Sequence, residues 1–182
     1  MDRIVDSRDQ KFVLYEMLNV TELCKTDMFS DFDQEMFDMT LDLTKQICEE
    51  HVLGCYQEVD REGGAKFDNG KVTIPKQYHE LHKIMNEAGL FTMGVSKDAG
   101  GQGFPYTICL ASYEYYSFHM GFMLYPEATT GAAHLIEVFG TERQKRLYMD
   151  KMYAQKWGGT MCLTEPDAGS DVGNLKTKAV RQ

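Results

Sequence analysis

The sequence predicts a mainly α-helical protein, in which a helical domain of about six helices is followed by the first strands of a truncated β domain. Apolar residues recur every three or four positions over most of residues 9–153. Glycine and proline separate these stretches, and short alternating runs replace them near the carboxyl end. We therefore divide the chain into an N-terminal extension (1–29), a helical domain (30–155) and the start of a β domain (156–182).

The first helices are expected from short apolar patterns. Residues 9–18 form a brief amphipathic stretch that we expect to dock on something larger. Ser30 is expected to cap a longer helix, with Asp33 at its third position, and Gly54 to end it. Residues 60–73 are rich in glycine and charge and are expected to form a loop. The buried face of the longer helix is expected to hold Met36, Phe37, Leu41, Leu43, Ile47, Cys48 and Val52.

The next helices have clearer ends. Pro75 suits a first helical position, and Gly89 suits a left-handed cap residue. Residues 94–105 hold too many glycines and prolines for a regular element. A helix then resumes, and Pro126 is expected to interrupt it.

A last pair of helices is expected before the β-like region. The first covers residues 128–139 and closes at Gly140, and the second begins at a Thr141–Gln144 capping box and runs to about Tyr153. Residues 157–164 and 176–180 are β-like. Because an edge strand without partners exposes its backbone groups, we expect the chain to be a fragment of a longer protein.

Composition excludes several classes of function. The chain of 182 residues has 28 acidic against 19 basic side chains, a net charge of -9, and no basic cluster, so nucleic acid is not an expected partner. No apolar run approaches the roughly 20 residues of a membrane span, and the start is charged where a secretory signal is apolar. Five cysteines without a C-x-x-C pair predict reduced thiols in the cytoplasm rather than disulfides or a zinc cluster.

The histidines and tyrosines are expected to be structural. His79 and His82 stand three apart on one helix but have no third metal ligand at a suitable spacing, so we interpret them as surface or boundary residues. The isolated histidines receive the same interpretation: His51, His119 and His134. The tyrosine cluster is expected to pack against neighbouring helices: Tyr113, Tyr115 and Tyr116.

The best-defined candidate site is the segment 161–171, in which a strand-like run leads into a tight turn of small residues. Such a turn leaves backbone N–H groups and two hydroxyls open, so it can hold a phosphate or the polar edge of a flat ring. From the residue pattern alone, a structural β-turn punctuated by Pro166 and Gly169 is the simpler explanation.

The run T-E-P-x-A-G-S-D at residues 164–171 resembles the flavin-site signature of the acyl-CoA dehydrogenase family. Residues 140–145 are similar to the family's G-[ST]-x-x-Q-K helix start, and a glycine cluster at 100–103 precedes them in the right order. The resemblance covers the chain from about residue 30. Residues 8–16 and 101–105 are most similar to a longer bacterial branch that includes methylmercaptopropionyl-CoA dehydrogenases.

The resemblance implies a site for FAD and acyl-CoA. By position, Met161, Leu163 and Thr164 would lie along the flavin ring, with the Thr164 hydroxyl bonding its pyrimidine edge. Gly169 and Ser170 would reach the flavin phosphate and the acyl-CoA, so Ser170 is the expected substrate contact.

Two further residues of the signature, and two departures from the family pattern, complete this comparison. Glu165 and Asp171 are expected to fix the turn rather than do chemistry. Residues 96–101 replace the usual P-E-E-Y-G-G, and Met161 stands where many members have an aromatic residue.

In the resembling family a carboxylate removes the α-proton of an acyl-CoA while the β-hydrogen leaves as hydride to the flavin, giving an enoyl-CoA. That base lies in a second helical domain, so we assign no catalytic residue here. An electron-transferring flavoprotein is the implied acceptor, and the implied assembly is a homo-oligomer. The alternatives are an acyl-CoA oxidase or related flavoenzyme of the same fold, and a non-catalytic helical interaction module.

Overall fold

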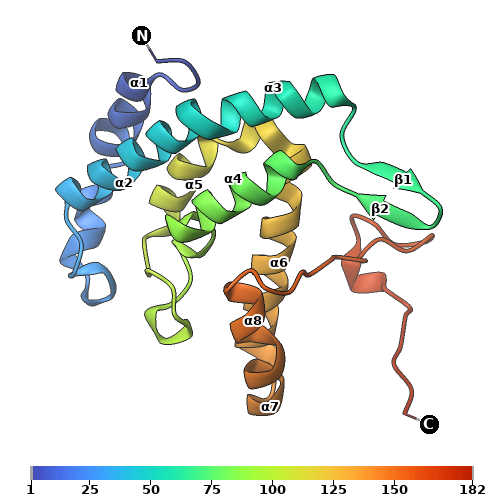
Figure 1. Ribbon diagram of the computed structural model, residues 1–182. Coiled ribbons are helices and arrows are strands. Elements are labelled where there is room, and N and C mark those ends of the chain that lie inside the picture. The colour runs from blue at the N-terminus through green and yellow to red at the C-terminus, as the bar shows by residue number, and fades with distance from the viewer. Residues whose placement is uncertain (1, 182) are drawn as a thin grey trace.

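A computed structural model describes residues 2–181, and it is mainly helical, as the sequence predicts (Figure 1). π-helical turns at 48–52 and 145–149 join neighbouring α-helices into longer segments, and one at 12–17 extends the first helix. The α-helices are α1 (Ser7–Lys11), α2 (Gln34–Ile47), α3 (Leu53–Glu62), α4 (Lys76–Glu87), α5 (Tyr106–Glu114), α6 (Met120–Phe139), α7 (Glu142–Gln144) and α8 (Asp150–Tyr153). The strands β1 (Lys66–Asp68) and β2 (Lys71–Thr73) pair as an antiparallel hairpin.

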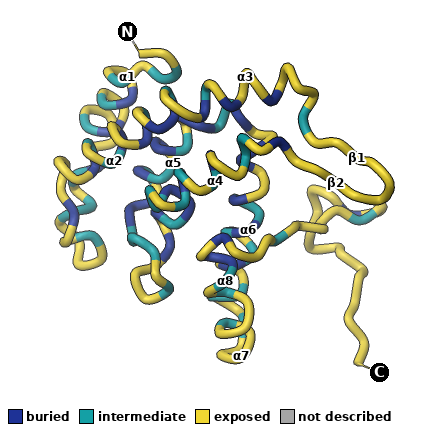
Figure 2. Tube along the Cα trace, viewed as in Figure 1, coloured by how far each residue is buried: buried dark blue, intermediate teal, exposed yellow. Residues whose placement is uncertain are grey.

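The helices pack around one centre. The segment made by α2 and α3 crosses the top of Figure 1, with α4 and α5 beneath it and α6 running downward beside α8. Contacts between α2 and α5, α3 and α4, and α6 and α8 hold this arrangement. Figure 2 shows that buried segments gather at the centre, whereas the hairpin and the tail after α8 are exposed.

The core is apolar with one buried polar link. Side chains from α2, α4 and α5 supply its most buried members, and the Thr44 and Ser112 hydroxyls bond each other across it at 2.9 Å. A smaller cluster joins α6 and α8 through Ala133 and Met152. Burial of such side chains supplies most of the stability of a helical domain. Largest among the fully buried residues are Phe37, Leu41, Met85, Ile108 and Tyr115.

Each expected helix is present, and local chemistry sets several ends as predicted. Gly89 follows α4 in the left-handed region at φ 73°, which favours glycine. Thr141 accepts from the Gln144 amide while the Gln144 side chain accepts from Thr141 N–H, which is the predicted capping box. The turn of the hairpin falls at Asn69 and Gly70.

The predicted ends of the second helix were wrong. Asp33, not Ser30, is the cap, and its carboxylate accepts from the Met36 amide at 2.8 Å. The helix also continues through Gly54 to Glu62, because buried residues further along fix it against the core. Met36 and Leu43, expected to be buried, are 39% and 45% exposed. Among the residues that hold the extra turns are Val52, Cys55 and Val59.

Two other expectations fail for similar reasons. Residues 60–73 are not a plain loop but contain the end of α3 and the β hairpin. Pro126 does not interrupt α6, although proline removes one backbone donor. Phe122, Met123 and Pro126 itself are buried, so packing on this side keeps the helix continuous.

The tail departs from the predicted β pattern. Within residues 2–181, the segments 157–164 and 176–180 form no strand, and the pairing nearest to them is a single bridge between Glu165 and Ala168. A strand needs a partner for its ladder of hydrogen bonds, and these segments have none among the described residues.

Candidate functional site

The five residues that the resemblance assigns to the flavin and substrate lie together on the surface of the tail. Met161 is 73% exposed and Leu163 44% exposed. Thr164, Gly169 and Ser170 are exposed as well. The structure therefore places these side chains where a ligand can reach them, and their roles stay predictions.

The turn behind these residues is held by a carboxylate. Glu165 and Ala168 exchange backbone hydrogen bonds at 2.9 and 3.2 Å. The Glu165 carboxylate accepts from the amides of Lys176 and Thr177 at 2.8 and 2.9 Å. Hydrogen bonds from Thr177, and then from Lys176, hold the pKa of Glu165 below its ordinary value. Glu165 therefore fixes the turn, as the sequence predicts, and Asp171 accepts from the Asn174 side chain beside it.

The root of the tail is tied to α6. The Gly159 amide donates to the Thr129 hydroxyl at 3.0 Å. The Gln155 side chain donates to the Thr130 hydroxyl at 3.2 Å, and that hydroxyl donates to the Phe91 carbonyl at 3.3 Å. The tail thus starts from a defined position beside the segment 90–95.

Next to this root is an apolar cavity of about 580 Å³. Its wall comes from the segment 90–95, from α5 and from α6, with Tyr153 of α8. Mostly apolar walls with few polar groups are typical of sites for small ligands. Among its lining side chains are Phe91, Met93, Cys109, Leu110, Met123 and Pro126.

One acid holds the outer side of this cavity together. Glu137 accepts from Ser96 at 2.7 Å and from Tyr153 at 2.5 Å, and it pairs with His134 at 3.3 Å. These bonds connect the glycine-rich loop (residues 94–105) with α6 and α8. Burial raises the pKa of Glu137, but the bonds from Tyr153, Ser96 and His134 outweigh it and leave the pKa lowered.

The glycine-rich loop reaches this wall through close backbone contact. A Cβ atom on Gly101 would lie 2.2 Å from the Val95 carbonyl oxygen. The Gly103 amide donates to that same carbonyl at 2.9 Å. The loop therefore has a defined shape although its residues differ from the family pattern.

Glu127 of α6 was not predicted from the sequence. It lines the cavity, and its Oε1 atom is buried without a hydrogen-bond partner among the described residues. Burial raises the pKa of this carboxyl to about 6. A signal was available, because Glu127 stands between Met123 and Thr130 on a helix whose other residues around it are apolar or small.

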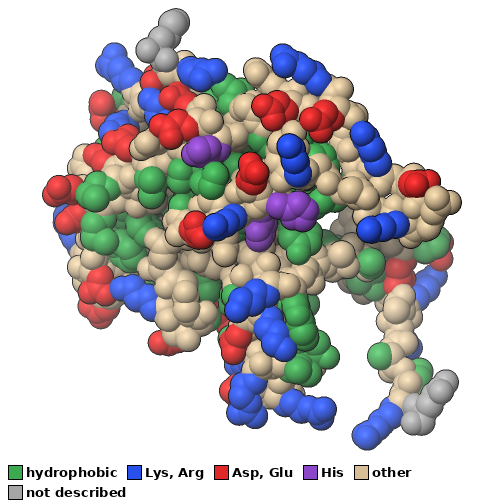
Figure 3. Space-filling view, viewed as in Figure 1, with side chains coloured by type: hydrophobic (Ala, Val, Ile, Leu, Met, Phe, Trp, Pro, Cys, Tyr) green, Lys and Arg blue, Asp and Glu red, His purple; other side chains and the backbone are tan. Residues whose placement is uncertain are grey.

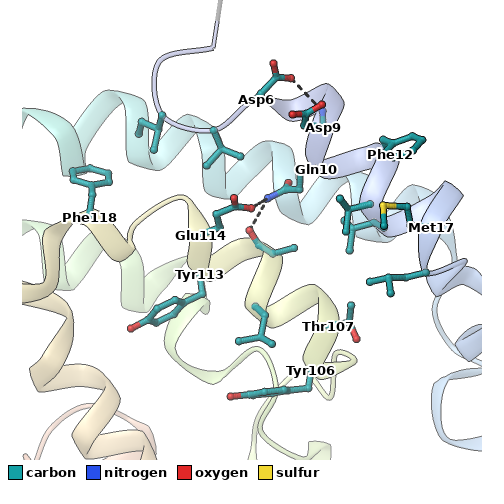
Figure 4. Close-up of a pocket in the computed structure, with 17 residues that line it drawn as sticks. Asp6, Asp9, Gln10, Phe12, Met17, Tyr106, Thr107, Tyr113, Glu114 and Phe118 are labelled. Carbon is teal, nitrogen blue, oxygen red and sulfur yellow. Dashed lines mark hydrogen bonds between the residues drawn. The ribbon is translucent and has the colours of Figure 1, made fainter.

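A second hollow, of about 1140 Å³, lies between the N-terminal helix and α5 (Figure 4). Gln10 bridges its base, donating to the Ala111 carbonyl and to Glu114, each at 2.9 Å. Phe12 and Met17 are 44% and 64% exposed on its rim. The expected N-terminal helix thus docks through Gln10 and Leu14, while much of its apolar face remains open.

The expected roles of histidine and tyrosine need one correction. His119 is not a surface residue: it is 4% exposed and contacts Cys55 at 3.9 Å between aromatic rings. No local pattern marks such burial, because it comes from aromatic rings of α3, α4 and α6 that pack around His119. Tyr115 and Tyr116 are 2% and 4% exposed, which confirms their packing role.

The expectation that this acidic chain has no basic cluster is wrong at one end of the domain. Lys and Arg side chains gather at the lower end of the view in Figure 3, over α7 and α8. Within residues 2–181 no helix has the length and apolar character needed to cross a membrane. No group of three metal-ligating side chains occurs in the same part of the chain. The basic residues include Arg143, Arg146 and Lys151.

The structure is thus a helical domain with a packed core and an apolar cavity beside α5 and α6, followed by a polar turn. The chain belongs to the acyl-CoA dehydrogenase family: the family model for the acyl-CoA dehydrogenase N-terminal domain matches residues 33–156.

Similar proteins have the same family character. The 3-methylmercaptopropionyl-CoA dehydrogenase of Ruegeria pomeroyi is 30% identical, over 96% of this chain and 30% of its own length. A broad-specificity linear acyl-CoA dehydrogenase of Mycobacterium tuberculosis is 34% identical over 96% of this chain and 29% of its own length. A butyryl-CoA dehydrogenase of Syntrophomonas wolfei is 31% identical over 94% and 28%. The chain thus spans under a third of the length of these curated relatives.

Proposed function

We propose that this chain is the N-terminal part of a flavin-dependent acyl-CoA dehydrogenase, which oxidises the α,β bond of an acyl-CoA thioester. Family membership supports the enzyme class, and the three relatives described above are dehydrogenases of acyl-CoA substrates. The apolar cavity between α5, α6 and the segment 90–95 carries the proposal, because it offers an acyl chain an apolar wall.

The cavity suits the acyl part of such a substrate. Its lining is mainly aliphatic and aromatic, and transferring a methylene group from water into such surroundings is favourable by roughly 0.8 kcal/mol. The bonds that Glu137 accepts keep the walls from α6, α8 and the loop in register. A chain of several methylenes would gain affinity there without any polar contact.

The exposed tail residues fit one edge of a flavin. Met161 and Leu163 offer apolar surface, and Thr164 adds a hydroxyl that can bond the polar edge of the ring. Gly169 and Ser170 follow directly, on a turn that Glu165 already holds. We assign the first four of these residues to FAD, and Ser170 to both FAD and acyl-CoA.

Bound FAD would accept the hydride equivalent that the acyl chain loses. The role of this chain is to orient the reactants. Its cavity would hold the acyl chain, and residues 161–170 would hold the edge of the flavin ring. We assign no base to residues 1–182, and we expect the 182-residue chain alone not to oxidise acyl-CoA.

The enzyme's surroundings follow from the same proposal. An electron-transferring flavoprotein would reoxidise the flavin, and copies of the enzyme would associate. Support for a covered surface comes from α6, where Leu135 and Phe139 are 60% and 80% exposed. The cysteines of the described chain are free, which fits a reducing cytoplasm. The proposed enzyme would take part in fatty acid β-oxidation in that compartment.

Spectroscopy of the complete enzyme that contains this chain tests the proposal. We expect a yellow protein whose flavin absorbance bleaches when an acyl-CoA is added under anaerobic conditions. Transfer of electrons to an electron-transferring flavoprotein would distinguish a dehydrogenase from an oxidase, which would form peroxide instead. A colourless protein that binds no FAD would contradict the proposal and favour a helical interaction module.

A further inference from the structure

Glu127 lines the cavity that we assign to the acyl chain, and one of its carboxylate oxygens has no hydrogen-bond partner among the described residues. Its Oε1 atom is buried and lacks a hydrogen-bond partner within residues 2–181. A buried carboxylate oxygen normally has a partner, because leaving it unpaired costs its lost hydration. The position therefore calls for a donor that comes from outside the described chain.

The other polar groups of the cavity wall are already engaged. The Thr130 hydroxyl donates to the Phe91 carbonyl, and Tyr153 donates to Glu137. His134 also pairs with Glu137. These groups cannot turn to Glu127 without giving up their present bonds.

Two tyrosines of the cavity wall, Tyr113 and Tyr116, do not supply the missing hydrogen bond to Glu127 either. The Tyr113 hydroxyl donates to the Met120 sulfur at 3.9 Å, and its ring packs against Tyr116 at 5.1 Å in an edge-on arrangement. Burial is the main cause that raises the pKa of both tyrosines, and the charge of Glu127 adds to it. Glu127 lines the same cavity as the two tyrosines. It thus faces the cavity in a mainly apolar setting.

We propose that Glu127 is a specificity-determining residue that selects acyl groups whose tail carries a hydroxyl, which donates a hydrogen bond to its carboxylate. This inference rests on the proposed function, because it assigns the tail of the acyl chain to the same cavity. A purely aliphatic tail would fill the space but leave the buried carboxylate unpaired. A site built to bond a hydroxyl rejects the analogue that lacks it.

The test compares two families of substrate on the complete enzyme. Straight-chain acyl-CoAs of increasing length are assayed beside their ω-hydroxy counterparts, and kcat/KM is measured for each at pH 8. We expect the ω-hydroxy compound to be preferred at one chain length by about tenfold, since a hydrogen bond to a charged group is worth that much. In Glu127→Met this preference should disappear, and the aliphatic substrate should improve.

Two further variants keep the test sharp. Glu127→Gln preserves the shape and one acceptor oxygen without the charge. Its preference for the ω-hydroxy substrate should be weaker than that of the wild type and stronger than that of Glu127→Met. This variant also keeps the test possible if Glu127→Met fails to fold. Glu87→Met removes an exposed glutamate of α4 and should leave the preference unchanged.

Equal hydroxyl preference in the wild type and in both Glu127 variants would overturn the inference while leaving the acyl-CoA dehydrogenase proposal intact. An enzyme that oxidises neither substrate family would overturn the proposed function and this inference with it.

Discussion

Met85 and Met161 are the same residue type in opposite surroundings. Met85 of α4 is fully buried in the core, at 0% exposure, whereas Met161 of the tail is 73% exposed. The helices bury their apolar side chains in the core, which stabilises the fold. The tail exposes its apolar side chains next to a turn that Glu165 holds by hydrogen bonds. The comparison separates residues that build the scaffold from residues that are free to contact a ligand.

The largest expected effect comes from this pair. Met85→Ala should lower the free energy of unfolding by roughly 2 to 5 kcal/mol, because it removes a buried side chain and leaves a cavity. Met161→Ala should change it by less than about 0.5 kcal/mol. Chemical denaturation of the two variants measures both values, and a large stability loss at Met161 would contradict the division between scaffold and display.

Local sequence chemistry explains which features of the scaffold were predictable. Gly89 ends α4 and the Thr141–Gln144 box begins α7, because both depend on neighbours along the chain. The extension of the helix past Gly54 and the burial of His119 depend on contacts between residues far apart in the sequence. The neighbouring residues along the chain therefore do not predict them.

The candidate site divides in the same way. The turn at residues 164–171 was recognisable, since its residue types carry a family signature. The cavity was not, because its wall combines the segment 90–95 with two helices distant in sequence. The expected strands of the tail failed because alternation alone supplies no partner for a ladder.

Two glycines allow the same comparison, because Gly101 lies in close contact with the backbone and Gly54 has open space around it. Gly101→Ala would place a Cβ atom 2.2 Å from the Val95 carbonyl oxygen, so we expect a loss of about 3 kcal/mol in unfolding free energy. Gly54→Ala is the matched control, since nothing lies within 4 Å and alanine favours a helix by about 1 kcal/mol. Thermal melts that shift in the same direction for both variants would count against the loop geometry.

Glu127 connects the scaffold to pH. Burial raises its pKa from 4.5 to about 6, so the folded state holds this proton more tightly than the unfolded state does. The contribution of Glu127 to stability is therefore fully present below pH 4.5 and is lost as the pH rises through 6.

Glu127→Gln cannot titrate and should lack this loss, so its stability relative to wild type should increase between pH 4.5 and pH 7. Glu87→Gln, at an exposed position, serves as the control. Denaturation across this pH range measures the difference, and parallel curves for wild type and Glu127→Gln would show that the carboxyl is not buried as described.

Titration of FAD into the apo form of the complete enzyme tests the central claim most directly, that the tail displays ligand contacts rather than structural ones. Thr164→Val keeps the side-chain shape and removes one hydrogen bond, so FAD affinity should fall roughly tenfold while the melting temperature without FAD stays unchanged. Ser170→Ala should raise the apparent substrate constant with less effect on FAD. Equal FAD affinity for wild type and Thr164→Val, with a lowered melting temperature, would contradict the account.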